Sequence, residues 1–104
     1  MRRRALVPVL LAAAFPGAAA DAPAKARQCA PCHGPMGLSV QPDAPNLAGQ
    51  PRAYLVAQLA AYRSGKRVNE QMNVMARSLA DADIEEIAEW FSSLKVEVKK
   101  NGAG

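Results

Sequence analysis

One short motif constrains this chain more than any other feature. In Cys29-Ala30-Pro31-Cys32-His33, two cysteines are separated by two residues and are followed at once by a histidine. Cys-x-x-Cys-His is the attachment signal for a c-type haem. The two thiols form thioether bonds with the vinyl groups of the haem, and the short loop brings the imidazole of His33 beneath the iron as proximal ligand. The motif therefore predicts one covalently attached haem c.

Other uses of this motif fit the rest of the chain less well. A thioredoxin-like dithiol shares the Cys-x-x-Cys spacing but requires a βαβ setting, and the sequence shows no strand pattern. A structural zinc site needs four cysteine or histidine ligands, whereas the chain has two cysteines and one histidine. A disulfide between Cys29 and Cys32 would close too short a loop to constrain the unfolded chain.

Residues 1–20 have the three parts of a secretory signal peptide. Arg2 to Arg4 form a basic start, Ala5 to Phe15 form an apolar run, and Ala18 to Ala20 form a small-residue cleavage site. The apolar run is shorter than the roughly 20 residues that a membrane-spanning helix needs. We expect cleavage near Ala20, a periplasmic mature protein of residues 21–104, and no stable membrane insertion. An uncleaved anchor is the alternative.

Removal of this leader changes the charge balance. The whole chain has 13 basic and 9 acidic residues and a formal charge of +4. Three of the arginines lie in the leader, so the mature chain would have a formal charge of +1, which two haem propionates would cancel or slightly reverse. A near-neutral protein lacks the basic surface typical of nucleic-acid binding, so no nucleic acid is expected as a partner.

Helical patterns predict an all-α domain in residues 21–104. The first helix is expected to begin at Asp21 and Pro23 and to continue from Ala24 to Ala30. The second is expected between Pro51 and Gly65, which suit a helix start and a helix end. The third is expected over 81–94. The apolar faces of the last two helices are formed by Leu55, Leu59 and Tyr62, and by Ile84, Ile87, Ala88, Phe91 and Leu94.

The rest of the mature chain is irregular or mixed, and its core is small. Glycines and prolines predict a long loop over 34–50, a feature that is uncommon in a small domain unless the loop has a function or wraps something. Only 5% of residues are aromatic. So short a domain usually needs a staple such as a cofactor, and a haem would supply most of the missing core.

A second axial ligand would decide between electron transfer and ligand binding. Methionine sulfur opposite a histidine raises the reduction potential of haem iron. Met36 lies too close to His33 in sequence to reach the opposite haem face easily. Met72 and Met75 lie farther along, between the two amphipathic helices, where a loop could return to that face. The spacing alone does not separate these two, and ordinary core filling is the alternative for both.

Several further segments follow the haem motif in order: Pro45-Asn46-Leu47-Ala48-Gly49-Gln50, Tyr54-Leu55, Gln58-Leu59, Ser64-Gly65-Lys66-Arg67, Met72-x-x-Met75-Ala76-x-x-Leu79, and Asp83-Ile84 to Phe91. Over nearly all of residues 21–104, the chain resembles the small bacterial class I cytochromes c of the c-four and c-five-fifty-three type. The resemblance implies a fold of about four short helices and long loops wrapped around one covalent haem.

The resemblance also implies roles for individual residues. His33 and Met75 would be the axial ligands, with Met72 as the alternative to Met75. The Pro45 carbonyl would accept the Nδ1 hydrogen of His33 and so fix the imidazole. The haem crevice would be lined by Leu47, Tyr54, Leu59, Leu79, Ile87 and Phe91. Ala80 replaces the Ser or Thr that caps the last helix in the family, and we expect Asp81 to take over that cap.

The function implied is that of a one-electron carrier without substrate chemistry of its own, and hence not an enzyme. Its partners would be redox proteins, such as membrane or periplasmic reductases and oxidases, met as a monomer or through transient association. One alternative is a haem-bearing subunit of a periplasmic dehydrogenase or sulfur-oxidising complex. Another is a five-coordinate haem that binds gas or peroxide, which would require that neither methionine reaches the iron.

Overall fold

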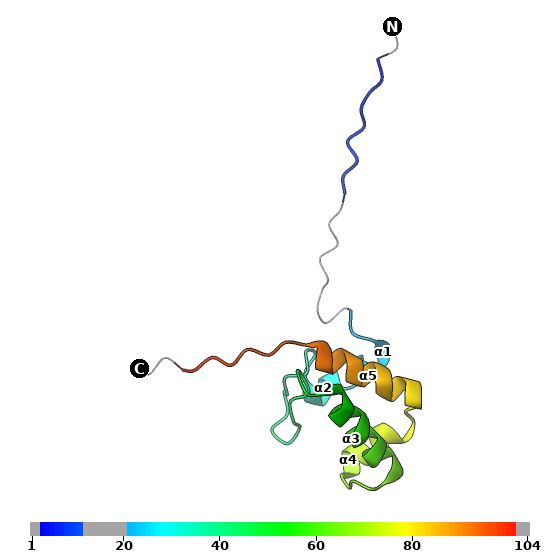
Figure 1. Ribbon diagram of the computed structural model, residues 1–104, viewed down its shortest axis with the longest axis vertical. Helices are drawn as coiled ribbons and strands as arrows, with labels where there is room; N and C mark the ends of the chain where they lie inside the picture. The colour runs from blue at the N-terminus through cyan, green and yellow to red at the C-terminus, as the bar shows by residue number, and fades with distance from the viewer. Residues whose placement is uncertain (1–2, 12–20, 102–104) are drawn as a thin grey trace.

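The computed structural model describes residues 3–11 and 21–101 (Figure 1). Within these ranges the chain forms five helices and no strand: α1 (Ala24–Arg27), α2 (Ala30–His33), α3 (Arg52–Ser64), α4 (Glu70–Arg77) and α5 (Asp81–Ser93). The predicted all-α class is confirmed. None of the helices in the described ranges is long and apolar enough to cross a membrane.

The predicted leader is described only in part. Residues 3–11 are extended, and Leu6, Leu10 and Leu11 are each at least 90% exposed. The predicted cleavage site at Ala20 lies outside the described residues. The signal peptide and the boundary at residue 21 therefore stay predictions.

The first helix is divided into two, so the prediction of one helix from Asp21 through Ala30 is wrong. Helix α1 begins after Pro23 and ends at Arg27, and α2 begins at Ala30. Pro31 has no N–H, so it cannot donate to the carbonyl of Arg27 as a continuous helix would require. The backbone tightens instead, and the N–H of Cys29 donates to Ala26 O at 3.0 Å. The division falls at Gln28 and Cys29, where the haem motif begins.

Helix α3 lies between the two residues predicted to bound it. Pro51 is its N-cap, and Gly65 follows it with a φ of 83°, in the left-handed region that favours glycine. Leu55 on the predicted apolar stripe is buried, and Leu59 and Tyr62 are partly buried against the same core. The helix packs against both α4 and α5.

The segment before α5 is helical, so the prediction that a loop carries Met72 and Met75 is wrong. Asn69 adopts extended backbone and accepts a hydrogen bond from Met72 N at 2.9 Å, which caps α4. This is the usual way in which an asparagine satisfies a free N–H at a helix start. Both Met72 and Met75 therefore lie on a helix, roughly one turn apart.

The cap of α5 differs from the one predicted. Ala80 is the N-cap and has no side-chain acceptor, but Asp83 reaches back and accepts from Ala80 N at 2.9 Å. Asp81 is bound instead by Arg63, whose Nη2 lies 2.6 Å from the carboxylate. The expectation that Asp81 caps the helix is wrong because Asp83, at the third helical position, has the reach for the reciprocal bond.

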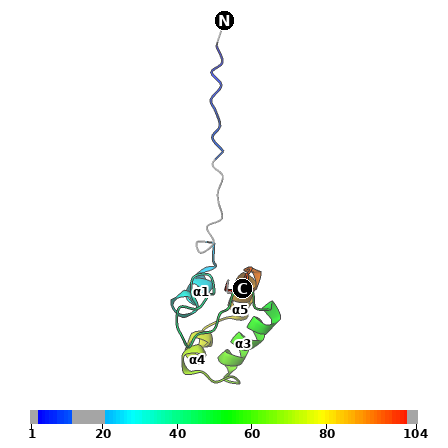
Figure 2. The same ribbon diagram turned by 90° about the vertical axis from the view of Figure 1, so that its left-hand side faces the viewer.

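The core lies against α5, with α1, α3, α4 and α5 placed around the middle of the domain (Figure 2). Phe91 is 1% exposed and is the largest fully buried side chain. The buried cluster consists of Ala26, Leu55, Ala76, Leu79, Ile84, Ile87, Ala88 and Phe91. Three of these eight residues are alanines, so the chain itself supplies a thin core, as expected for a domain that needs a cofactor.

Candidate haem-binding site

The two cysteines lie on and just before α2. Cys32 belongs to the helix, Cys29 is its N-cap, and both thiols are free and half-buried. Burial, and then the neighbouring Cys32, raises the pKa of Cys29 to about 11. At neutral pH Cys29 is therefore a protonated thiol. A thiol is the species whose S–H adds across a vinyl double bond to give a thioether.

His33 ends α2 and is 7% exposed. Its Nδ1 lies 2.8 Å from the carbonyl oxygen of Pro45. A carbonyl oxygen can only accept, so Nδ1 carries the hydrogen and donates it. The other ring nitrogen, Nε2, then keeps its lone pair and can serve as a metal ligand. The hydrogen bond implied by the family resemblance is present in the structure.

A network of backbone hydrogen bonds holds the loop that carries Pro45. Leu47 N and Ala48 N both donate to the carbonyl of Gly37, at 2.8 and 3.0 Å. Gly49 N donates to Phe91 O at 2.9 Å, which fixes the loop to α5. Asn46 adds a side-chain bond by accepting from Ser39 N at 2.7 Å. The acceptor of His33 is therefore positioned by the body of the domain.

Glycine is required at two positions of this loop. Gly34 has a φ of 80°, and a Cβ there would lie 1.9 Å from the carbonyl oxygen of Leu38. Gly37 has a φ of 73°, and a Cβ there would lie 2.8 Å from Ala48 N and from the Phe91 ring. Real Cβ atoms do not approach other atoms so closely, and the left-handed backbone is itself unfavourable for other residues. The two glycines let the chain leave α2 and fold back beside His33.

The predicted lining residues fall into two groups. Leu79, Ile87 and Phe91 are buried in the core cluster, and Leu47 and Leu59 pack against it with Cys29. Tyr54 and Met75, by contrast, are each 45% exposed. These two large side chains on α3 and α4 remain available to a further apolar group. Contact of either group with haem stays a prediction.

Sequence reasoning missed two side chains that shape the site. Asn46 bridges the Pro45 loop to Ser39, and Asn69 caps the helix that carries both methionines. An asparagine followed by an acidic residue is a helix-start signal, so Asn69-Glu70 could have revealed α4. No comparable local signal marks Asn46, because its partner is fixed by how the loop folds.

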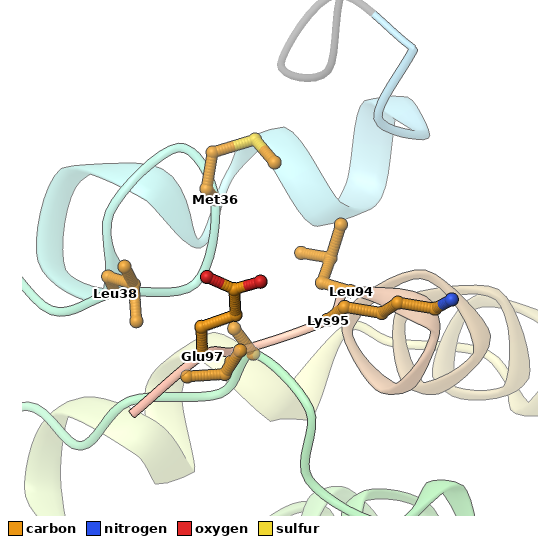
Figure 3. A pocket seen from close by; sticks show the side chains of 7 residues that line it. Met36, Leu38, Leu94, Lys95 and Glu97 are labelled. Carbon is orange, nitrogen blue, oxygen red and sulfur yellow. The ribbon is translucent and has the colours of Figure 1, made fainter. Parts of the chain in front are cut away.

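Met36, unlike Met72 and Met75, does not lie on α4. It lines a shallow pocket of about 280 Å³ together with Leu38, Ala48, Leu94, Lys95, Val96 and Glu97 (Figure 3). This pocket lies between the loop that follows the haem motif and the tail that follows α5. In the close view the Glu97 carboxylate points into the space below Met36, and the Lys95 ammonium extends away from it. None of the residues predicted to bind haem lines this pocket.

The residues present fit a covalently bound haem. Two free thiols stand at the attachment spacing, a buried histidine keeps Nε2 available, and a thin core is bordered by half-exposed apolar side chains. When bound, the haem would supply a redox-active iron and a large apolar surface. Cys29, Cys32 and His33 would hold it on the α2 side, and α4 offers methionine sulfur.

An all-helical domain of this size, with a Cys-x-x-Cys-His motif and an oriented histidine, defines a c-type haem protein. The family model described as cytochrome c matches residues 19–95. The chain belongs to the cytochrome c family, and its cofactor is haem c, attached through Cys29 and Cys32.

Individual relatives support this assignment. Cytochrome c4 of Pseudomonas aeruginosa is 42% identical, over 79% of this chain and 41% of that protein. A thiosulfate dehydrogenase electron acceptor of Stutzerimonas stutzeri is 41% identical, over 64% of this chain and 32% of that protein. Cytochrome c-554(548) of Halomonas halodenitrificans is 41% identical, over 74% of this chain and 96% of that protein. The chain thus spans less than half of the first two relatives and nearly all of the third.

A solved structure shows the same arrangement. Cytochrome c4 of Acidithiobacillus ferrooxidans matches with a TM-score of 0.60 and 39% identity, over 64% of this chain and 38% of that chain. This likeness agrees with the all-α class I fold implied by the sequence resemblance.

Proposed function

We propose that this protein is a one-electron carrier whose haem iron is held between His33 and Met75. The observation that carries the proposal is the hydrogen bond from His33 Nδ1 to the Pro45 carbonyl, at 2.8 Å. It fixes the imidazole tautomer and increases electron donation from Nε2. A rigid, strongly donating ligand suits an iron that changes oxidation state without exchanging ligands.

Met75 is the proposed second ligand because of its position and exposure. It lies on α4, and 45% of its surface is exposed, whereas Met72 is half-buried. An exposed thioether on a capped helix can meet a group that the chain itself does not supply. Methionine opposite histidine raises the reduction potential and leaves no open position on the iron. A six-coordinate iron favours electron transfer over binding of gas or peroxide.

The carrier is proposed to act in the periplasm, after removal of residues 1–20. The basic start, the apolar run and the small residues before Asp21 support export. The near-neutral charge of residues 21–104 supports transient docking with weak electrostatic steering. Its partners would be reductases and oxidases that exchange single electrons with the haem, and the chain would have no substrate chemistry of its own.

Optical spectra of the haem-loaded protein test this proposal. A carrier with His/Met ligation gives low-spin spectra in both oxidation states and a reversible one-electron titration. The reduced form does not bind carbon monoxide rapidly. High-spin spectra with rapid carbon monoxide uptake would replace the carrier with a five-coordinate, ligand-binding haem.

A second candidate function is suggested by the name that two of the relatives share. Because the Stutzerimonas protein is named a thiosulfate dehydrogenase electron acceptor, this chain could serve a sulfur-oxidising enzyme, either as its soluble acceptor or as a fixed subunit. Gel filtration of a periplasmic extract separates the two forms. A free carrier elutes near the mass of the single chain, whereas a subunit elutes with the enzyme. Reduction of the purified protein by thiosulfate and the enzyme would support either form.

A further inference from the structure

The turn between α3 and α4 is held by one side chain. Asn73 Nδ2 donates to the carbonyl oxygens of Tyr62, at 2.8 Å, and Arg67, at 2.9 Å. Its Oδ1 accepts from Asn69 N at 2.8 Å. Both amide hydrogens and the amide oxygen are therefore used. These three bonds join the last turn of α3, the connecting loop and the start of α4.

Neighbouring contacts reinforce this junction. Asn69 O accepts from Asn73 N at 2.8 Å, and Asn69 Oδ1 accepts from Met72 N at 2.9 Å. On the α3 side, Arg67 N donates to Ala61 O at 3.1 Å, and the Arg67 guanidinium lies 4.8 Å from the centre of the Tyr62 ring. The Asn73 side chain hydrogen-bonds to Tyr62 on the α3 side of this junction and to Asn69 on the α4 side.

Apolar packing contributes little to holding α4. Its buried residue is Ala76, a methyl group, while Val74 and Met75 are 59% and 45% exposed. A short helix with so little buried surface depends on its polar anchors for its position. Asn73 lies between Met72 and Met75 in sequence, so any movement that follows its loss would carry both sulfur atoms.

We propose that Asn73 is a positioning residue that holds α4 and thereby sets how firmly Met75 stays on the haem iron. The inference rests on the proposed His/Met ligation. Without the amide, the Tyr62 and Arg67 carbonyls and the Asn69 N–H lose their shared partner, and α4 can move away from α3. Transient loss of the sulfur ligand then becomes more frequent while the rest of the fold persists.

The test is the rate at which the oxidised, haem-loaded protein binds cyanide, measured at saturating cyanide without denaturant. Under these conditions the rate is limited by release of the methionine. We expect Asn73→Ala and Asn73→Asp each to increase this rate about tenfold or more, as loss of one or two net hydrogen bonds would. Both variants lack the Nδ2 hydrogens that bind the Tyr62 and Arg67 carbonyls, so either variant that folds tests the proposal.

Two controls separate positioning from general stability. Gln71→Ala changes an exposed amide on α4 that makes no hydrogen bond within the described part of the chain, and it should leave the rate unchanged. Ile84→Val thins the core on α5 and should lower the unfolding midpoint without a matching increase in cyanide rate. Equal acceleration by Ile84→Val would show that Asn73 acts through global stability alone and would overturn the proposal.

The wild-type spectrum separates failure of this inference from failure of the proposed function. If the oxidised wild type has the weak sulfur-to-iron absorption band and the Asn73 variants bind cyanide at the wild-type rate, only the positioning role is overturned. If the wild type lacks that band and binds cyanide at once, methionine ligation fails, and the positioning role fails with it.

Discussion

The carbonyl oxygen of Pro45 accepts a hydrogen bond from Nδ1 of His33 at 2.8 Å, across twelve positions of sequence. The loop between them folds back on itself at Gly37, whose carbonyl binds both Leu47 N and Ala48 N. The orientation of the proposed iron ligand therefore depends on a loop that has no regular secondary structure.

Gly37→Ala should disturb this arrangement strongly. The new Cβ would lie 2.8 Å from Ala48 N and from the Phe91 ring, at a φ of 73°. We expect the free energy of unfolding of the haem-loaded protein to fall by about 3 kcal/mol, the combined cost of overpacking and left-handed backbone. The reduction potential should also rise, because a loosened His33–Pro45 bond weakens donation from the imidazole.

Gly65→Ala is the matched control for this substitution. Gly65 has a similar φ of 83°, but a Cβ added there would meet no atom within 4 Å. Only the cost of the left-handed backbone remains, so denaturant titration should show a decrease of about 1 kcal/mol in the free energy of unfolding. Equal losses for the two alanine variants would mean that the crowding at Gly37 is unimportant.

Ala80→Ser should stabilise the protein. Ala80 is the N-cap of α5 and offers no side-chain acceptor, although Asp83 already completes one half of the capping box. A serine hydroxyl can accept from the free N–H of Asp83. We therefore expect the free energy of unfolding, measured by heat or denaturant, to increase by about 0.5–1 kcal/mol. Ala82→Ser, on the exposed first turn, should give no gain. A neutral or destabilising Ala80→Ser would contradict the capping account.

Arg63→Ala should lower the free energy of unfolding more than Asp81→Asn does. Arg63 Nη1 donates to Leu79 O at 3.0 Å and its Nη2 pairs with Asp81, whose side chain is 89% exposed. Loss of the bond to Leu79 should cost about 1.5 kcal/mol, since the donor is charged. Neutralising Asp81 should cost less than about 0.5 kcal/mol, as for exposed ion pairs. Denaturant titration of both variants decides this order, and the reverse order would show that the ion pair dominates.

Omission of haem should leave the chain largely unfolded. The described core contains three alanines among eight buried residues, with Phe91 as its largest fully buried side chain. Such a core is too small to offset the conformational entropy of the chain without the prosthetic group. Circular dichroism of the chain made without haem attachment should show little of the helix signal of the haem-loaded protein. A haem-free chain with the full signal and cooperative thermal unfolding would disprove this account of the core.

The parts of the fold that could be predicted from sequence are those decided by local chemistry. Pro51 and Gly65 bound α3 because one fixes a helical start and the other tolerates left-handed backbone. The break between α1 and α2 was missed, although Pro31 could have indicated it, because the alanine-rich stretch favours a continuous helix. Helix α4 was missed because it is only eight residues long and its cap depends on one asparagine.

The residues of the candidate site also divide into those marked by a local motif and those brought together only by folding. Cys29, Cys32 and His33 could be predicted because the motif is contiguous in sequence. The Pro45 acceptor followed from family resemblance, since no local pattern identifies which carbonyl will meet an imidazole across a loop. Asn46 and Asn73 were missed because their partners are backbone atoms brought together only by folding. The choice of Met75 over Met72 stays a prediction, as both lie on α4.

The measurement that tests the central claim most directly is the optical spectrum of the oxidised, haem-loaded protein, compared among the wild type, Met75→Ala and Met72→Ala. If His33 and Met75 hold the iron, the wild type and Met72→Ala have the weak sulfur-to-iron band, and Met75→Ala loses it and binds added ligands. Loss of the band in Met72→Ala but not in Met75→Ala would assign the ligand to Met72. A wild type that is high-spin and without the band would contradict His/Met ligation and the electron-carrier function built on it.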